Sequence, residues 1–461
     1  MVGIASDAFV FFGATGDLAR RKVFPALQAM TSLGQLDMPV IGVSRGGLSV
    51  TALREMAHSA LQQEGTLDPV AFERLSMRLQ YVDGDYRDPD CYRRLKLSLG
   101  DSHRPIFYLA IPPSVFADVI RGLASSGCAT GARIIVEKPF GRDLASAQAL
   151  NRTLHEEFPE ESIFRIDHYL GKEAVQNLLY FRFANAFLEP IWNRTYVSEI
   201  QVTLAETLGV DGRGALYDEI GTLRDVVQNH LLQVLSLLAM DAPTGRDAGA
   251  MRMAKLRLLR ATRPLDPAWA VRGQFEGYHA EPGVIPGSNT ETCAAVRLYI
   301  DTWRWSDVPI YLRAGKRFPV TATEVHVNLR APPINLFDDE TPNRENYFRF
   351  RLSPEVVISA GARVKLPGDL MAGESVELVA RRQADSGRLP YARLLHDAIC
   401  GEPALFSDAE SVEAAWRIID PVLGDAVPIA RYAPGTWGPA AKMDGLLCGG
   451  RWNDPFATES A

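Results

Sequence analysis

The sequence is poor in cysteine, with five in 461 residues. These cysteines lie far apart and form no CxxC pair. Their odd number and wide spacing argue against both a disulfide framework and a zinc site, and no other metal site is expected. We therefore expect reduced thiols, as in a cytoplasmic protein, at Cys91, Cys128, Cys293, Cys400 and Cys448.

Long apolar runs and an excess of positive charge are also missing. The chain has 49 Lys and Arg against 56 Asp and Glu, a formal net charge of −7. This balance gives no general attraction to nucleic acid or anionic lipid, so any bound anion must be held by a local basic cluster. The first residues, MVGIASDAFVFFGATGD, have no basic start and only a short apolar run, so neither a signal peptide nor a membrane span is expected.

What is present is enough apolar sequence for two folded domains, since 47% of the residues are hydrophobic. Residues 1–165 alternate short apolar runs with helical patterns, which predicts a parallel α/β domain. Residues 166–461 contain longer strands such as EIQVTLAE and TEVHVNLR, which predict an α+β domain with a large, mostly antiparallel sheet. The Gly-rich tail after Arg431 has the composition of a surface extension.

A glycine-rich turn, GATGDLA, follows the first expected strand, AFVFF. The turn is a variant of the dinucleotide fingerprint, in which small residues let a pyrophosphate approach the backbone N–H groups at a helix start. A tight strand-to-helix turn without a ligand is the alternative interpretation. Its place after the first strand of an α/β pattern favours a nucleotide.

Two basic residues follow later strands of the same domain. Arg45 comes after MPVIGVS, where an NAD enzyme is expected to carry an acid and where Arg suits a 2′-phosphate. Lys138 comes after ARIIVE, at the sheet edge where ligands bind in open α/β folds. Taken alone, either residue can equally be interpreted as an ordinary charged side chain that points into water.

The chemical groups gather further along the chain. The strand IFRI leads into Asp167-His168-Tyr169-Leu170-Gly171-Lys172, where three donors at a helix start suit a phosphate dianion. His230 lies in the apolar helix VVQNHLLQVLSLLAM, where a histidine is most often a structural core residue. Paired with Asp167, it has the logic of a general base, because the carboxylate orients the imidazole and supports its protonated form.

Taken together, GATGDLARRK, EKPFGRDL, RIDHYLGKE, RDVVQNH, AVRGQFEGY, SNTETCAA and WRWSDVPIYLRAGKR resemble glucose-6-phosphate dehydrogenases, in that family's order and over nearly the whole chain. The resemblance implies a Rossmann-like domain and a β+α domain whose sheet builds the dimer interface, in a homodimer or a homotetramer. The implied reaction is oxidation of D-glucose 6-phosphate to 6-phosphogluconolactone with NADP, the first step of the oxidative pentose phosphate pathway.

The resemblance also implies roles for individual residues. His230 would remove the C1-hydroxyl proton, with Asp167 as its partner. The phosphate would be held by His168, Tyr169 and Lys172, and the sugar hydroxyls would be read by Glu206, Asp225 and Lys316. Lys138 would contact both cofactor and substrate. The remaining cofactor residues implied are Gly13, Thr15, Gly16, Asp17, Leu18, Arg45, Asp85 and Tyr108.

Two departures from the family pattern concern the sugar site. Thr321 stands where the family usually has a second basic residue after Lys316, and Ser353 stands where it usually has Gln. Losing such contacts costs about 1–3 kcal/mol each. Another hexose 6-phosphate therefore stays an alternative substrate. On separate grounds, NAD stays a secondary cofactor, because family members of dual specificity can carry an Arg at the position of Arg45. A catalytically silent NADP-binding paralogue is the remaining alternative function.

Overall fold

A computed structural model describes residues 5–334, 336–337, 346–367, 371–382 and 389–456. The chain divides into two compact units, and the sequence order is interrupted in both. Unit 1 comprises Met1–Lys172, Pro243–Met253 and Asp385–Glu413; unit 2 comprises Glu173–Ala242, Ala254–Ala384 and Ala414–Ala461. The structure thus differs from the expected single break between 165 and 166, because a late helical segment joins the core of the first unit.

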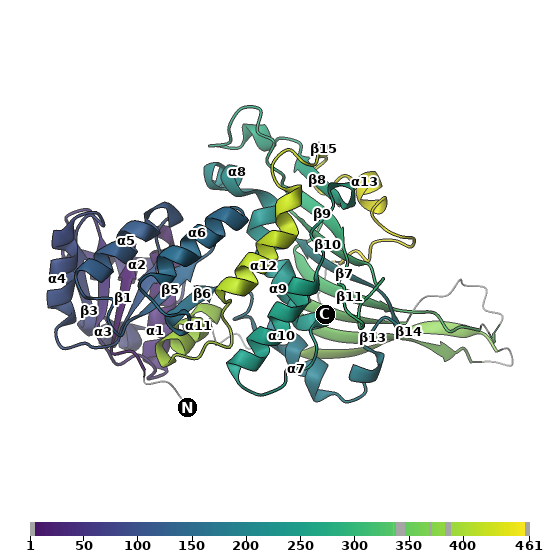
Figure 1. Cartoon of the computed structure of the whole chain (residues 1–461), viewed down its shortest axis with the longest axis horizontal. Helices are drawn as coiled ribbons and strands as arrows, with labels where there is room; N and C mark the ends of the chain where they lie inside the picture. Colours follow the sequence, from purple (N-terminus) through teal and green to yellow (C-terminus); the bar gives the residue numbers. More distant parts are fainter. Residues whose placement is uncertain (1–4, 335, 338–345, 368–370, 383–388, 457–461) are drawn as a thin grey trace. The chain divides into compact units, whose positions relative to one another are not determined.

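The first unit is built on a six-stranded sheet in the order β3-β2-β1-β4-β5-β6, with all neighbours parallel (Figure 1). This confirms the predicted α/β class. The strand β1 is buried along its whole length, as expected for a parallel strand covered on both faces. The strands are β1 (Ala8–Phe12), β2 (Val40–Ser44), β3 (Leu79–Asp83), β4 (Pro105–Leu109), β5 (Arg133–Glu137) and β6 (Ile163–Ile166).

Helices cover this sheet, and one face has a core formed by β1, β4, α1, α2, α3 and α11. The late helix α11 belongs here because Leu394, Leu395 and Ile399 insert into that core. The helices and helical turns of unit 1 are η1 (Ala19–Val23), α1 (Phe24–Ser32), α2 (Val50–Gln63), α3 (Pro69–Arg78), α4 (Pro89–Leu99), η2 (Pro113–Val115), α5 (Phe116–Ser125), α6 (Leu144–His155), η3 (Glu160–Ser162) and α11 (Pro390–Cys400).

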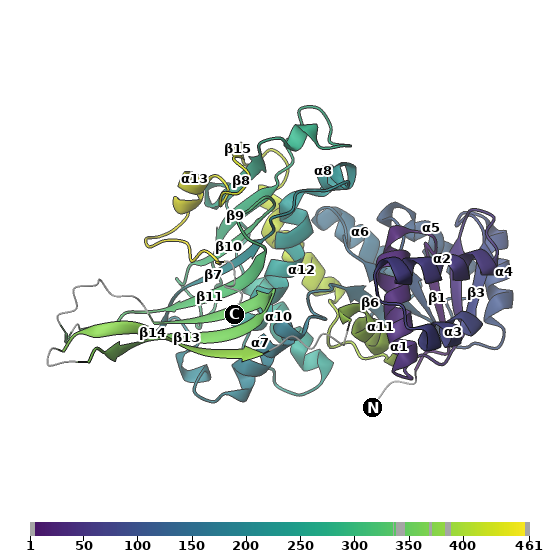
Figure 2. The same ribbon diagram turned by 180° about the vertical axis from the view of Figure 1, so that it is seen from behind.

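The second unit contains a nine-stranded sheet in the order β14-β13-β12-β11-β7-β10-β9-β8-β15. Its neighbours are antiparallel except for the pairs β7–β10 and β8–β15, so the sheet is mostly antiparallel, as predicted. Figure 2 shows its long strands from behind. They are β7 (Val197–Ala205), β8 (Ala270–Phe275), β9 (Cys293–Leu298), β10 (Ile310–Gly315), β11 (Ala322–Leu329), β12 (Tyr347–Ser353), β13 (Val356–Lys365), β14 (Gly373–Arg382) and β15 (Ile429–Tyr432).

One face of this sheet is apolar and packs against helices. The alternation in β12 places Phe348 and Phe350 on this face, where Trp192 lies 5.7 and 6.2 Å from their ring centroids. The helical elements of unit 2 are α7 (Glu173–Ala184), η4 (Glu189–Ile191), α8 (Gly214–Thr222), η5 (Leu223–Leu231), α9 (Leu232–Ala239), η6 (Pro267–Trp269), η7 (Tyr278–Ala280), η8 (Asp420–Val422) and α13 (Ala440–Asp444). Two helices, α10 (Ala248–Ala261) and α12 (Ala409–Ile419), contribute residues to both units.

The opposite face of the sheet carries charged side chains that the C-terminal tail covers. Arg313 donates to Asp454 at 2.7 Å, and its guanidinium carbon lies 4.4 Å from the ring centroid of Trp452 and 4.5 Å from that of Trp437. Further along the tail, the carbonyl of Phe456 accepts a hydrogen bond from Arg351. The tail is therefore part of the fold of unit 2, and the expectation of a surface extension is wrong.

No helix in the part of the chain that the structure describes is long and apolar enough to cross a membrane.

Replacing Trp452 by Ala should lower the free energy of unfolding of the protein by about 2–4 kcal/mol, because a buried indole and its contact with Arg313 are lost. Urea unfolding followed by circular dichroism measures this change. Trp303→Ala is the matched control, since Trp303 is 100% exposed and its loss should leave the midpoint unchanged. Equal effects of the two substitutions would contradict the role given to the tail.

Candidate active site

The glycine-rich turn Gly13–Leu18 directly follows β1, at the point where the strand order reverses between β1 and β4. Gly13 has φ +83°, and a Cβ there would lie 2.2 Å from the carbonyl oxygen of Ala110. The N–H of Gly16 donates to the carbonyl of Gly13 at 2.9 Å and closes the turn. Ligands of open α/β sheets bind at this switch point, so the turn fits a dinucleotide pyrophosphate.

Arg45 is exposed directly after β2, the strand that neighbours β1. Its loop is fixed to β3, because the N–H of Gly47 donates to the carboxylate of Asp83 at 2.8 Å. A guanidinium held at this edge is well placed for a cofactor phosphate. Contact between Arg45 and a cofactor stays a prediction.

Asp85 lies in the loop that follows β3 and is exposed. Its carboxylate accepts from the N–H of Arg87 at 2.9 Å and so orders its own loop. In the same loop, the hydroxyl of Tyr86 accepts a hydrogen bond from the N–H of Gly13 at 3.0 Å. Sequence reasoning missed Tyr86, which ties this loop to the glycine-rich turn.

A buried carboxyl, Glu137, lies at the end of β5 beside Lys138. The hydroxyl of Tyr108 donates to it at 2.6 Å, and Tyr391 also hydrogen-bonds to it. Burial raises the pKa of Glu137 to about 7, while the two phenols and Lys138 oppose the rise. Tyr108 is fully buried in β4 with its hydroxyl on Glu137, and contact between Tyr108 and a cofactor stays a prediction.

The turn after β6 collects four of the predicted site residues. Asp167 is buried, and its Oδ1 accepts from the N–H of Tyr169 at 3.0 Å. The Nζ of Lys172 lies 3.6 Å from the ring centroid of Tyr169, and the ring of His168 lies edge to face with that ring at 5.2 Å. Two basic groups and a phenol therefore share one turn, a composition that suits a phosphate dianion.

Tyr391, on α11, joins this turn and was missed by sequence reasoning. Its ring stacks on His168 with centroids 6.5 Å apart, and the Nζ of Lys22 lies 6.0 Å from its centroid. The pattern PYARLLHDAIC indicates an amphipathic helix but does not show which distant residues its tyrosine contacts. Through Glu137, Tyr391 links the expected phosphate site to the strand end that carries Lys138.

In the second unit, two predicted sugar-reading residues meet at a strand end. Glu206 follows β7 and Lys316 follows β10, and these strands are parallel neighbours. The ammonium of Lys316 forms an ion pair with the Glu206 carboxylate. The backbone fixes both residues, since the N–H of Glu206 donates to the carbonyl of Gly315 at 3.0 Å. The pair offers a donor and an acceptor to a polyhydroxylated ligand.

Asp225 and His230 both lie on η5, a nine-residue segment with π-helical hydrogen bonding between α8 and α9. The segment packs against β9 and β10, and His230 is buried. Such wide helical turns are rare and occur often at functional sites. The placement is consistent with a functional His230, whose role as a base stays a prediction.

The departures from the family pattern also have defined contacts. The hydroxyl of Thr321 lies 2.8 Å from that of Thr207 and accepts from the N–H of Thr207 at 3.0 Å. Ser353 ends β12 and pairs with Thr323 of β11. The guanidinium of Arg317, next to Lys316, lies 3.6 Å from the carboxylate of Glu281 and so already has an acidic partner. Thr321 therefore braces the loop beside Glu206.

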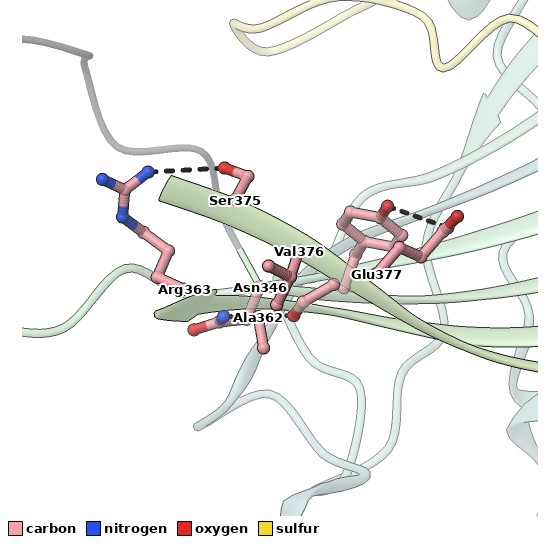
Figure 3. A pocket seen from close by; sticks show the side chains of 8 residues that line it. Asn346, Ala362, Arg363, Ser375, Val376 and Glu377 are labelled. Carbon is pink, nitrogen blue, oxygen red and sulfur yellow. Dashed lines mark hydrogen bonds between the residues drawn. The ribbon is translucent and has the colours of Figure 1, made fainter. Parts of the chain in front are cut away.

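A small pocket of unit 2 lies elsewhere, on β12, β13 and β14 (Figure 3). Arg363 donates to Ser375 at 3.3 Å and Tyr347 donates to Glu377 at 2.9 Å, so its charged groups have partners. None of the predicted site residues lines it.

The parallel sheet with a glycine-rich turn at its reversal point defines unit 1 as a dinucleotide-binding domain of the dehydrogenase class. Two family models match the chain: "Glucose-6-phosphate dehydrogenase, NAD binding domain" over residues 10–177 and "Glucose-6-phosphate dehydrogenase, C-terminal domain" over residues 179–452. The chain belongs to the glucose-6-phosphate dehydrogenase family, which confirms the resemblance seen in its motifs.

Similar proteins cover nearly the full length. The chain is 42% identical to glucose-6-phosphate 1-dehydrogenase 1 of Mycobacterium tuberculosis, over 98% of this chain and 97% of the relative. It is 39% identical to the glucose-6-phosphate 1-dehydrogenase of Rhizobium meliloti, over 97% of each. Among solved structures, the Mycobacterium avium enzyme matches with TM-score 0.92 and 40% identity, over 99% of this chain and 100% of that one. A glucose-6-phosphate dehydrogenase in complex with its substrate glucose 6-phosphate matches with TM-score 0.87 and 32% identity, over 97% and 98%.

The raised pKa of Glu137 predicts a pH dependence of stability. Between the ordinary value of 4.5 and about 7, the folded protein holds a proton that the unfolded chain has released. Raising the pH through this window should therefore lower the unfolding free energy of the wild type relative to Glu137→Gln, by roughly 2–3 kcal/mol. Urea unfolding of both proteins from pH 5 to 8 tests this, and parallel pH profiles would refute it.

Proposed function

We propose that this protein oxidises D-glucose 6-phosphate at C1 to 6-phosphogluconolactone, using NADP as the hydride acceptor. Family membership over residues 10–177 and 179–452 carries this proposal. The substrate-bound relative, which matches over 97% of this chain, supports the same sugar phosphate. The retained groups argue against a silent paralogue, because neither the candidate base nor the phosphate-binding turn is missing.

His230 acts as the general base in this proposal. Its imidazole takes the proton of the C1 hydroxyl as the C1–H bond breaks and the C1=O bond of the lactone forms. The oxidised nicotinamide, when bound, supplies the acceptor for the hydride. Asp167 orients the imidazole and stabilises its protonated form, and the hydrogen bond from Tyr169 N–H holds that carboxylate in a single orientation.

The turn after β6 binds the substrate phosphate. His168, Tyr169 and Lys172 provide donors and positive charge within one turn. Lys138, which follows Glu137 on β5, contacts both cofactor and sugar. The carboxyl of Glu137 keeps this strand end in place through its two phenol hydrogen bonds.

Glu206, Asp225 and Lys316 read the sugar hydroxyls. Charged groups that share hydrogen bonds with several hydroxyls discriminate well between sugars, because a missing partner leaves a buried charge unsatisfied. A different hexose 6-phosphate is the second candidate substrate. The observation that favours it is Thr321, a neutral residue whose hydroxyl is already engaged by Thr207.

NADP is the proposed cofactor because Arg45 is exposed where the 2′-phosphate of the adenosine ribose is expected. The turn Gly13–Leu18 receives the pyrophosphate, and Asp85 and Tyr108 are the remaining proposed cofactor residues. NAD is a weaker alternative. The enzyme is further proposed to be cytoplasmic and to assemble as a homodimer or homotetramer.

His230→Asn should reduce kcat for glucose 6-phosphate by at least about 100-fold, because the proton acceptor is lost while the binding groups remain. Initial rates of NADPH formation measure this, with galactose 6-phosphate, glucosamine 6-phosphate and free glucose as comparison substrates. Glucose 6-phosphate should give the highest kcat/KM. A higher value with another hexose 6-phosphate would establish the second candidate, and silence with all four would refute the proposed function.

Arg45→Ala should raise the KM for NADP by about 10-fold or more and leave the KM for NAD nearly unchanged, because only the 2′-phosphate loses a charged partner. Arg87→Ala is a suitable control, since Arg87 is also exposed at this sheet edge but pairs with Asp118 at 3.0 Å. Equal effects on both cofactors would contradict the assignment of Arg45.

A further inference from the structure

A fully buried ion pair lies beside the start of η5. Nε and Nη2 of Arg272, on β8, donate to one oxygen of Glu291 at 3.0 and 2.9 Å. The other donors of the guanidinium are also used, since Nη1 reaches the carbonyl of Val427 at 2.9 Å and Nη2 that of Asn289 at 2.6 Å. The Glu291 carboxylate is therefore held in a fixed position.

The second oxygen of Glu291 accepts a hydrogen bond from the N–H of Leu223, the first residue of η5, at 3.0 Å. Gly221 makes this approach possible, because a Cβ there would lie 2.5 Å from the same oxygen. The backbone N–H of Thr222 donates to the Glu291 carbonyl at 3.1 Å. Glu291 thus binds two successive N–H groups where the helix begins, which is also where a negative charge is favourable.

This anchor matters for the geometry of η5. The segment Leu223–Leu231 has wide π-helical turns, which are less stable than an α-helix and persist only where surrounding contacts hold them. If the first turn is released, the segment can rewind to α-helical hydrogen bonding. Rewinding changes the direction in which Asp225 and His230 project.

The residue after Glu291 also fixes the backbone of Lys316, one of the residues proposed to bind the sugar hydroxyls. The N–H of Lys316 donates at 2.9 Å to the carbonyl of Thr292, the residue after Glu291. The hydroxyl of Tyr217 lies 2.7 Å from that of Thr222, and the ring of Tyr217 lies 5.7 Å from the Nζ of Lys316. Glu291–Thr292 therefore fixes both η5 and the end of β10.

We propose that Arg272 and Glu291 are positioning residues for catalysis, which hold η5 in the winding that places Asp225 and His230 for reaction. This inference rests on the proposed function. Both side chains are buried and paired with each other, so in this proposal they act through the first turn of η5.

Two double variants separate positioning from stability. Arg272→Met with Glu291→Leu removes both charges, so no buried charge is left unpaired, but it also removes the acceptor for Leu223. This variant should lower Tm, because the carbonyls of Val427 and Asn289 also lose their donor, and at a temperature where it is folded it should lose at least about 10-fold in kcat. Arg272→Met with Glu291→Gln retains an acceptor and should recover kcat to within about threefold.

A second buried pair provides the matched control. Arg351 donates to Glu324 at 3.0 Å, both side chains are nearly inaccessible, and neither touches η5. Arg351→Met with Glu324→Leu should change Tm by a similar amount and leave kcat within about twofold. A loss of kcat in this control as large as in the Arg272 and Glu291 variant would overturn the proposal.

Glu291→Asp covers the case in which the first double variant does not fold. It keeps the charge and withdraws the carboxylate by one methylene, and it should lower kcat by about fivefold or more with faster hydrogen exchange of the amides of Leu223–Leu231. Unchanged kcat and unchanged exchange would overturn the proposal. Hydrogen exchange also separates this inference from the proposed function. An inactive wild type would refute the proposed function, while the exchange rates of Leu223–Leu231 would still show whether Glu291 holds the start of η5.

Discussion

The buried pair of Arg272 and Glu291 is the constraint on which the candidate chemistry of unit 2 depends. A carboxylate without water is costly unless its oxygens are hydrogen-bonded, and here the guanidinium of Arg272 and the backbone N–H of Leu223 bond to its two oxygens. Because Leu223 is the first residue of η5, the hydrogen bond that satisfies the buried carboxylate also fixes the start of this helix. The position of His230 follows from where this helix begins.

Unit 1 also buries a carboxyl group, but without an ion pair to a guanidinium. The carboxyl of Glu137 lies at the end of a buried strand, and burial favours its protonated form. The phenols of Tyr108 and Tyr391 hydrogen-bond to it, and Tyr391 also stacks on His168. Strand ends of a parallel sheet bring these groups to one edge, so that Lys138 and the proposed phosphate-binding turn share a common support.

Much of the fold could be predicted, because the length of the apolar runs and the spacing of apolar residues distinguish a parallel from an antiparallel sheet. The parallel and mostly antiparallel sheets are confirmed, and the local clusters at residues 13–18 and 167–172 lie where their strands predicted. What could not be predicted depends on contacts between distant segments. An amphipathic pattern does not say which core α11 joins, and Gly-rich composition hid the packing of Trp452. Tyr391 and Glu291 carry no local signal, because their partners lie far away in the sequence.

The most direct test of the account follows the hydrogen at C1. Glucose 6-phosphate deuterated at C1 is incubated with the protein and NADP, and the products are analysed by NMR. The account predicts that the deuterium appears at C4 of the reduced nicotinamide, with 6-phosphogluconolactone as the sugar product, and that His230→Asn slows this transfer without redirecting it. Deuterium released to water, or retained on the sugar phosphate with a folded protein, would contradict hydride transfer as the function of this chain.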